Sequence, residues 1–324
     1  MTSTNEKQKL LLLGFGDIAK RLASHLQKKG FGDYEITGIR RSVDSYAGVR
    51  VRQVDASDNA AMLAVTRENF DVIVITMTPD EMSDSGYQRA YVEPVQTLIT
   101  ALQKNTLSPQ LIIFVSSSSV YGQHNNEWVN ECSETCPTSF SGRRLLEAEK
   151  LLMNSPYTSS IVRFSGIYGV GRQRLIEQVR VGNVAKKVPV TYSNRIHSDD
   201  CAGVIAHIMA RHKQAQNIDT LYLATDCQPS ALADVKHWLG VQLGLVSDHF
   251  TSESIDVGSV NLNTVDSNTV DFNAEDSKPV SFKIGAKTLR GGKRCSNERL
   301  LASGYQFLYP TFKEGYKMVL DNLK

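Results

Sequence analysis

The sequence predicts an α/β fold built around a doubly wound parallel sheet. Two observations predict it. Short apolar runs, rich in the residues that suit buried parallel strands, recur along the chain, as at residues 71–76 and 111–115. Segments with helical spacing of apolar residues lie between these runs. Strands that alternate with helices in this way indicate a parallel sheet with helices on both faces.

Each expected strand has its own signal. An apolar run at residues 10–13 leads into a glycine turn, and residues 49–54 alternate between apolar and polar side chains as a half-buried strand does. The remaining strands are short segments rich in apolar and β-branched residues, and we place them at residues 34–40, 71–76, 111–115, 158–164 and 221–224.

The expected helices are recognised by their spacing and their first turns. Apolar residues recur at Ile18, Leu22 and Leu26 after the first strand. Asp199 and Asp200 would open a later helix, where negative charge suits the helix dipole. Beyond the first helix, we place helices at residues 58–69, 91–104, 141–153, 198–212, 229–239 and 312–323.

The chain of 324 residues is long for a single core, so we expect a main domain and a smaller lobe. We assign residues 1–165 and 190–225 to the sheet domain, and residues 166–189 and 226–324 to a mixed C-terminal lobe that holds substrate. Within that lobe, residues 247–277 contain no Lys or Arg and many Ser, Asn and Thr. Such a composition buries little apolar surface, so we predict a mobile insertion there.

Composition narrows the classes of partner and compartment. The apolar content of 41%, the charged content of 22% and the net charge of +2 are typical of a globular protein without a nucleic-acid or membrane surface. No apolar stretch is long enough to cross a membrane. Five scattered cysteines form neither a disulfide framework nor a metal-ligand pattern. We therefore expect reduced thiols, no metal site and a cytoplasmic protein.

The glycine turn is the most informative motif. Gly14-x-Gly16-x-x-Ala19 follows an apolar strand and opens a helix, which is the context of a dinucleotide-binding, Rossmann-type domain. Backbone N–H groups at the helix N-terminus favour an anion there. We predict that the pyrophosphate of the cofactor binds at Gly14, Phe15, Gly16, Asp17 and Ile18.

The end of the second strand indicates which dinucleotide binds. Arg40 and Arg41 stand where an NAD site usually has an acid, and a guanidinium can hold a 2′-phosphate with two N–H donors. This favours NADP(H). Asp44 is a nearby acid that could restore NAD(H) binding if its loop folds back, so NAD(H) is the alternative. Further cofactor contacts are predicted at Asp55, Thr76 and Met77.

Four stretches together resemble one superfamily: residues 14–19, 116–122, 163–169 and 194–202. Their order and spacing resemble the extended short-chain dehydrogenases/reductases, the NAD(P)-dependent epimerases and dehydratases that act on nucleotide-sugars. The resemblance implies a small-molecule substrate, a nucleotide-sugar, and a homodimer formed through the helices at 91–104 and 141–153.

The chain departs from this superfamily at the catalytic positions. Ser117, with Ser118 beside it, matches the hydroxyl residue that binds the reacting group. The usual Tyr and Lys are replaced by Ser141 and Leu145, while the acid that follows them is kept as Glu149. An aliphatic hydroxyl without a neighbouring cation is a poor base. In this respect the chain resembles the atypical members of the superfamily.

Other groups could take over proton transfer or substrate binding. Our catalytic candidates are Ser117, Ser118, Tyr121 and Ser141. Further candidates for acid, base or polarising group are His124, Arg143, Arg144 and Tyr168. The cations that could hold a substrate diphosphate are Arg172, Arg174, Lys186, Lys187, Arg195, Arg290, Lys293 and Arg294.

Two functions remain open from the sequence. The first is an NADP(H)-dependent oxidoreductase or epimerase without the usual Tyr/Lys pair, which the retention of Ser117 and Glu149 favours. The second is a non-catalytic NADP(H)-binding protein, either a redox sensor or a partner-binding module, which the losses at Ser141 and Leu145 favour.

Overall fold

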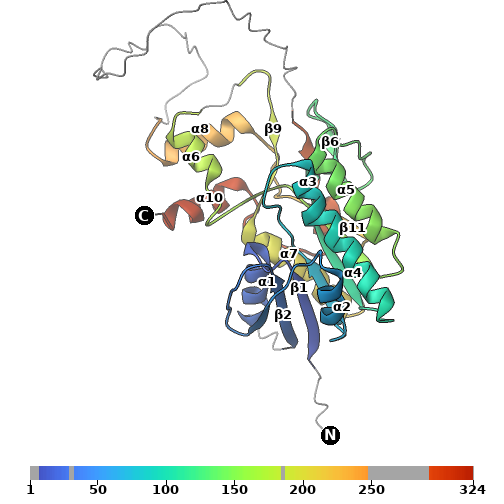
Figure 1. Cartoon of the computed structure of the whole chain (residues 1–324). Coiled ribbons are helices and arrows are strands. Elements are labelled where there is room, and N and C mark those ends of the chain that lie inside the picture. Colours follow the sequence, from blue (N-terminus) through green and yellow to red (C-terminus); the bar gives the residue numbers. More distant parts are fainter. Residues whose placement is uncertain (1–6, 29–32, 184–186, 247–291, 324) are drawn as a thin grey trace, which may run out of the picture.

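The computed structural model describes residues 7–28, 33–183, 187–246 and 292–323 (Figure 1). The insertion predicted at residues 247–277 lies outside the described residues, as do two of the candidate cations, Lys186 and Arg290.

The central sheet has seven strands in the order β11-β7-β5-β4-β1-β2-β3, and every neighbouring pair is parallel. The order reverses between β1 and β4, as in a doubly wound sheet with its ligand site at the switch point. The predicted Rossmann-type fold is therefore confirmed. The strands are β1 (Gln8–Leu13), β2 (Tyr34–Arg40), β3 (Val49–Gln53), β4 (Val72–Ile75), β5 (Leu111–Ser117), β7 (Ser159–Phe164) and β11 (Leu221–Ala224).

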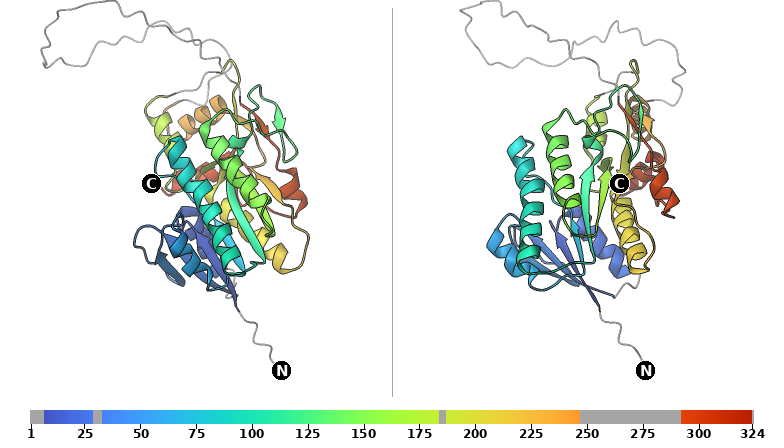
Figure 2. Two further views of the ribbon diagram at one scale, coloured as in Figure 1. Left: turned by 45° about the vertical axis from the view of Figure 1, so that its right-hand side comes forward. Right: turned by 90° about the vertical axis from the view of Figure 1, so that its right-hand side faces the viewer.

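Both faces of the sheet are covered by helices (Figure 2). In β1, Leu10 and Leu12 point into one core and Leu11 and Leu13 into the other, because successive strand residues face opposite sides. The first core includes α1 (Asp17–Lys28) and α7 (Ser198–Lys213). The second includes α2 (Asn59–Thr66), α4 (Glu93–Lys104) and α5 (Phe140–Met153).

The helix expected at residues 91–104 begins two residues later than its apolar spacing indicates. A short helix, α3 (Asp84–Tyr87), continues into a π-helical turn at Gln88–Val92, and regular α4 follows with Pro94 near its start. Pro is well tolerated in the first turn of a helix. Single π turns inside helices occur frequently at functional sites.

A separate small core lies beyond the carboxyl ends of the strands (Figure 1). It packs α6 (Arg174–Arg180), α8 (Leu232–Gln242) and α10 (Phe312–Asp321) together. The helix expected at 229–239 begins only at Leu232, because Ser230–Ala231 form strand β12 and pair with β9 (Tyr192–Ser193). The division of the chain into two domains stays a prediction.

Short elements connect this core to the sheet. Strand β8 (Gly166–Tyr168) pairs with β10 (Arg195–His197), and β6 (Trp128–Val129) pairs with β13 (Arg294–Cys295). A 3-10 turn follows β5 at Ser118–Val120, and α9 spans Glu298–Ala302. None of the described helices has both the length and the apolar character needed to cross a membrane.

Candidate functional site

The glycine turn between β1 and α1 leaves backbone amides facing outward. Gly14 has φ +86°, and a Cβ added there would lie 2.8 Å from the Met77 sulfur, so only glycine fits. The first hydrogen bond of α1 runs from the Lys20 N–H to the Gly16 carbonyl at 2.9 Å. The amides of residues 17–19 precede it and have no helical partner, which makes this helix end suited to an anion.

A cleft of about 560 Å³ opens beside this turn, at the carboxyl ends of β1 to β4. Asp17, Ile18 and Asp55, which we predicted to contact cofactor, do not line it. Instead, Asp55 accepts a hydrogen bond from the Ser57 N–H at 2.9 Å, and Ile18 is buried in the core. The other predicted cofactor residues do line the cleft, namely Gly14, Phe15, Gly16, Arg40, Arg41, Thr76 and Met77.

Thr78 also lines the cleft, in the stretch from Thr76 to Pro79 that the sequence predicts to run along the cofactor. Sequence reasoning did not single out the remaining wall residues, which are Ile39, Ser42, Val54, Ala56 and Asp80. Most of them stand at or just beyond the ends of strands, and that position is the signal by which they could have been found. The apolar members form a surface against which a flat aromatic base could pack.

The arginines at the end of β2 are paired with acids. Arg40 forms an ion pair with Asp44, which also accepts from the Lys20 ammonium at 2.6 Å. Asp44 thus neutralises Arg40 without lining the cleft, and the choice between NADP(H) and NAD(H) stays a prediction. Arg41 holds Asp80 with two hydrogen bonds, and this pairing keeps the pKa of Asp80 below its usual range.

The acid at the start of α1 is neutralised. Asp17 accepts from Arg21 at 2.8 Å and from Arg172, in the loop after β8, at 2.9 Å. Burial raises the pKa of Asp17, but the hydrogen bonds from Arg172 and Arg21 outweigh it and hold the pKa below its usual value. Because two arginines neutralise the Asp17 carboxylate, its charge does not repel an anion bound at the neighbouring amides.

Two of the catalytic candidates lie at the end of β5. The Ser117 Oγ accepts from the Ser119 N–H at 3.2 Å and caps the 3-10 turn. Ser118 forms a hydrogen bond with the Cys295 thiol, whose pKa burial raises to about 12. Both serines are partly exposed.

The start of α5 packs against the same turn. Gly142 touches it so closely that an added Cβ would lie 2.3 Å from the Ser119 carbonyl oxygen. The Ser141 hydroxyl lies 3.0 Å from that of Ser139, which caps α5. Leu145 is 3% exposed and part of the core, so position 145 offers no cation.

Tyr121 takes part in a buried polar network. Glu149 accepts from Arg163 at 3.0 and 2.6 Å and also from Ser116, and Arg163 donates to the Tyr121 hydroxyl at 2.9 Å. Tyr121 is 3% exposed, and burial raises its pKa to about 12. The Tyr121 hydroxyl is therefore enclosed and already has a partner, and a catalytic role for Tyr121 stays a prediction. Tyr168 is buried in the same way.

Three of the candidate cations converge on a second pocket of about 270 Å³ between β8, β10, α6 and α10. They are Arg172, Arg174 and Arg195. Arg195 is 5% exposed, and its Nη1 has no hydrogen-bond partner among the described residues. A buried guanidinium with a spare donor is suited to an anionic group.

The other candidate cations that the structure describes do not line this pocket. Lys293 donates to the Tyr121 carbonyl oxygen at 2.9 Å, and Arg294 stacks on the rings of Trp128 and Tyr192. Lys187 is exposed. Within the described ranges, no group of three His, Cys, Asp or Glu side chains could hold a metal ion.

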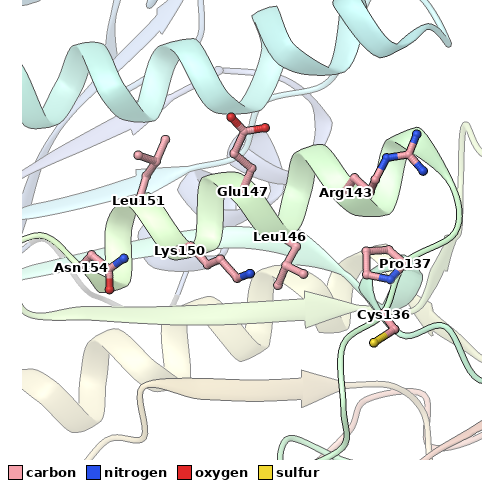
Figure 3. A pocket seen from close by; sticks show the side chains of 8 residues that line it. All are labelled: Cys136, Pro137, Arg143, Leu146, Glu147, Lys150, Leu151 and Asn154. Carbon is pink, nitrogen blue, oxygen red and sulfur yellow. The ribbon is translucent and has the colours of Figure 1, made fainter.

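A further pocket, of about 590 Å³, lies on the outer surface of α5 (Figure 3). Leu146, Lys150 and Pro137 line it. Arg143, a candidate polarising group, also lines it, but Ser117, Ser118, Tyr121 and Ser141 do not. It is therefore separate from the cleft beside the glycine turn.

The family profile of the NAD dependent epimerase/dehydratase family matches residues 10–220. The chain belongs to this family. It is 33% identical to a Methylobacillus flagellatus protein described as a candidate NAD-dependent epimerase/dehydratase, over 98% of both chains, with a TM-score of 0.73. No match was found among the curated proteins.

More distant structures share the fold. The Bordetella bronchiseptica enzyme WbmG, solved in complex with NAD, is 12% identical, with 99% of this chain and 95% of that one covered and a TM-score of 0.70. The UDP-glucose 4-epimerase of Thermotoga maritima, solved with UDP-glucose, is 12% identical over 98% of both chains, with a TM-score of 0.69.

Proposed function

We propose that this protein binds a nicotinamide dinucleotide in the cleft beside the glycine turn and acts as an oxidoreductase or epimerase. The observation that carries the proposal is the turn itself. The unpaired amides of residues 17–19 lie next to a cleft at the topological switch point of the sheet, and the acid at the same helix end is neutralised.

The residues of the cleft suit the parts of such a cofactor. Amides at the glycine turn would hold the pyrophosphate, and Ile39, Val54 and Ala56 offer an apolar wall to the adenine. When bound, the dinucleotide supplies or accepts a hydride. Ser117, at the end of β5, would orient the reacting oxygen with its hydroxyl.

We propose NADP(H) as the preferred cofactor. Lys20 of α1, together with Arg40 and Arg41 at the end of β2, gives three cations against the two acids that they pair with, Asp44 and Asp80. A 2′-phosphate could take the place of Asp44 between Lys20 and Arg40, because phosphate offers more acceptor oxygens than a carboxylate. NAD(H) is the alternative if Asp44 stays paired with Arg40 when the cofactor binds.

The substrate that we propose is an anionic small molecule of the nucleotide-sugar class. Arg172, Arg174 and Arg195 surround the second pocket, and a diphosphate needs two or three convergent cations. The UDP-glucose bound by the Thermotoga maritima neighbour is a molecule of this class.

Calorimetry followed by turnover assays tests the function. Titration with NADPH, NADP⁺, NADH and NAD⁺ should show binding at micromolar or tighter affinity. Panels of aldehydes, ketones and nucleotide-sugars should then give loss of reduced nicotinamide absorbance or epimerised product. Tight binding without turnover would favour the alternative, a non-catalytic NADP(H)-binding sensor, which the packed Leu145 supports. Absence of binding would overturn both.

We also propose a homodimer and a cytoplasmic location. The outer surface of α5, with half-buried Leu146 and Leu151, is the face on which a second copy would pack. Light scattering should then give twice the mass of one chain. The five free cysteines fit a reducing compartment.

A further inference from the structure

The first residue of α1 holds an arginine of the second pocket. The Asp17 carboxylate accepts from the Arg172 Nε through its Oδ2 at 2.9 Å and from the Arg21 Nε through its Oδ1 at 2.8 Å. Arg172 lies in the loop that follows β8, and it lines the second pocket together with Arg174 and Arg195. One ion pair therefore joins the helix that opens at the glycine turn to the pocket that we propose for the substrate.

The loop that carries Arg172 is fastened to α1 at a second point. Arg21 donates from its Nη2 to the Val170 carbonyl oxygen at 3.0 Å and from its Nη1 to Asp199 at 2.5 Å. The loop also turns back on itself, because the Arg172 N–H donates to the Gly169 carbonyl oxygen at 3.0 Å. Its backbone and its Arg172 side chain are therefore both held by α1.

The anchor uses only one nitrogen of the Arg172 guanidinium. Nε donates to Asp17, and no hydrogen bond from Nη1 or Nη2 is found among the described residues. Two parallel N–H donors of a guanidinium match two oxygens of a phosphate or carboxylate. In the same pocket Arg195, which is 5% exposed, adds an Nη1 without a partner among the described residues. The pocket therefore offers unpaired donors on two guanidinium groups, and Asp17 holds one of these groups in place.

We propose that Asp17 positions Arg172 to bind an anionic group of the substrate. Asp17 is a positioning residue, because it acts through Arg172 and lines neither the second pocket nor the cleft beside the glycine turn. This role rests on the proposed function, because it takes the second pocket as the substrate site.

The place of Asp17 in the chain makes this anchor useful for hydride transfer. Asp17 follows Gly16 and begins the helix whose first amides we assign to the pyrophosphate of the cofactor. The two reacting groups of an enzyme must be aligned closely, and a misplacement of about 1 Å can lower the rate about 100-fold. Because Arg172 is tied to Asp17, an anion bound by Arg172 is placed relative to the glycine turn, and so relative to the dinucleotide.

Removing the Asp17 carboxylate has two opposing effects on anion binding. Loss of the anchor frees the Arg172 side chain, and ordering that side chain again when an anion binds weakens the affinity by about three- to tenfold. Loss of the negative charge strengthens anion binding, but solvent screens this effect, because the Arg172 and Asp17 side chains are 37% and 38% exposed. We therefore expect a net weakening. An exposed ion pair contributes little to stability, so the fold should be unaffected.

The first test is calorimetric titration with UDP, with NADPH at saturation so that the glycine turn is occupied. Asp17→Asn should weaken UDP binding by about three- to tenfold, while the NADPH dissociation constant is no higher than in the native protein and the denaturant midpoint stays near the native value. Asp199→Asn is the matched control. Asp199 carries the same charge in the same network, but it pairs with Arg21 rather than with Arg172, so its removal should not weaken UDP binding.

The second test is a double-mutant cycle, which separates positioning from a general change in charge. Arg172→Gln alone should weaken UDP binding at least as much as Asp17→Asn does. In the Arg172→Gln protein there is no guanidinium for Asp17 to position. Adding Asp17→Asn there should therefore change the affinity for UDP by less than about twofold, whereas an effect through charge alone would persist.

The outcomes separate this inference from the proposed function. If NADPH binds but Asp17→Asn keeps the native affinity for UDP, or weakens it equally in the Arg172→Gln protein, the positioning role is overturned while the proposed function stands. If the NADPH-loaded native protein binds no UDP, the positioning role and the nucleotide-sugar substrate are both overturned, while dinucleotide binding stands. If the native protein binds no dinucleotide, the proposed function itself is overturned, and the positioning role with it.

Discussion

Glu149 links α5 to the central sheet through a buried ion pair. In the sequence its retention favours an enzyme. In the structure it is fully buried and holds Arg163 with two hydrogen bonds, joining α5 to β7, while Ser116 adds a bond from β5. Its retention is explained by the fold alone. Catalysis, as proposed, depends instead on Ser117 and the cofactor cleft.

Glu149→Gln should be strongly destabilising. The substitution leaves the Arg163 guanidinium buried without a counter-charge, which costs about 3–5 kcal/mol. Denaturant unfolding of both proteins measures the change. Glu147→Gln, on the exposed side of the same helix, is the control and should change the free energy of unfolding little. Equal effects of the two substitutions would contradict the structural role of Glu149.

Arg40 and Asp44 should act in opposite directions on cofactor choice. Arg40→Glu removes a donor from the end of β2 and adds a repulsive carboxylate, so it should weaken NADPH at least about tenfold more than NADH. Asp44→Asn frees Arg40 and Lys20 from their shared acid and should strengthen NADPH binding. Calorimetry with both cofactors measures these changes. Equal losses for NADPH and NADH in Arg40→Glu would refute this role of Arg40.

At the scale of elements, the β1–α1 unit combines two glycines with different tasks. Gly14 is required by backbone geometry, with φ +86° and the Met77 sulfur close by. Gly16 is in open space, since an added Cβ would come no nearer than 3.9 Å, to the Gly14 carbonyl oxygen. Folding therefore needs the first glycine, and close approach of a ligand needs the second.

Alanine at each position should separate these tasks. Gly14→Ala should lower the free energy of unfolding by about 1–3 kcal/mol, because a non-glycine residue is strained there. Gly16→Ala should fold as the native protein does, yet weaken dinucleotide binding by about tenfold or more, because its methyl group stands between the amides and the phosphates. Thermal denaturation and calorimetry distinguish the two effects. A Gly16→Ala protein with native affinity would argue against pyrophosphate binding at this turn.

At the scale of the whole molecule, Asp226 lies where the sheet meets the small core of α6, α8 and α10. It follows β11, is 1% exposed, and donates its N–H to the Arg195 carbonyl at 2.7 Å. Burial raises the pKa of its carboxyl to about 7, Arg195 opposes this rise, and the charges of Asp200 and Glu314 add to it. The junction between the two cores therefore contains an acid that prefers to be neutral.

This acid should make the stability of the protein depend on pH. The folded-state pKa lies above the unfolded value of about 3.9, so the folded state binds the proton more tightly. The stability that Asp226 contributes is present in full below about pH 4 and is lost as pH rises through about 7. Asp226→Asn should therefore be more stable than the native protein at pH 8, by on the order of 2–4 kcal/mol, with the difference vanishing near pH 4. Denaturant midpoints across this range measure it, and a constant difference would contradict the raised pKa.

Prediction from sequence worked where neighbouring residues decide the outcome. The strands at 71–76 and 111–115 could be predicted because a short continuous apolar run, rich in β-branched residues, is typical of a strand buried on both faces. The late start of α8 could not be predicted, because Ser230 and Ala231 pair with β9, which is distant in the sequence. The same limit applied to the site, where Tyr121 follows a promising motif and yet points into the buried Arg163 network.

The sequence by itself determined the order of the strands and helices along the chain and the glycine turn, because each depends on residues adjacent in the chain. Only the tertiary structure decided which charges meet. Asp17 is paired with Arg172, and Arg172 shares a pocket with Arg174 and Arg195. These contacts join segments far apart in sequence, and their energies depend on burial and distance, which no local pattern records.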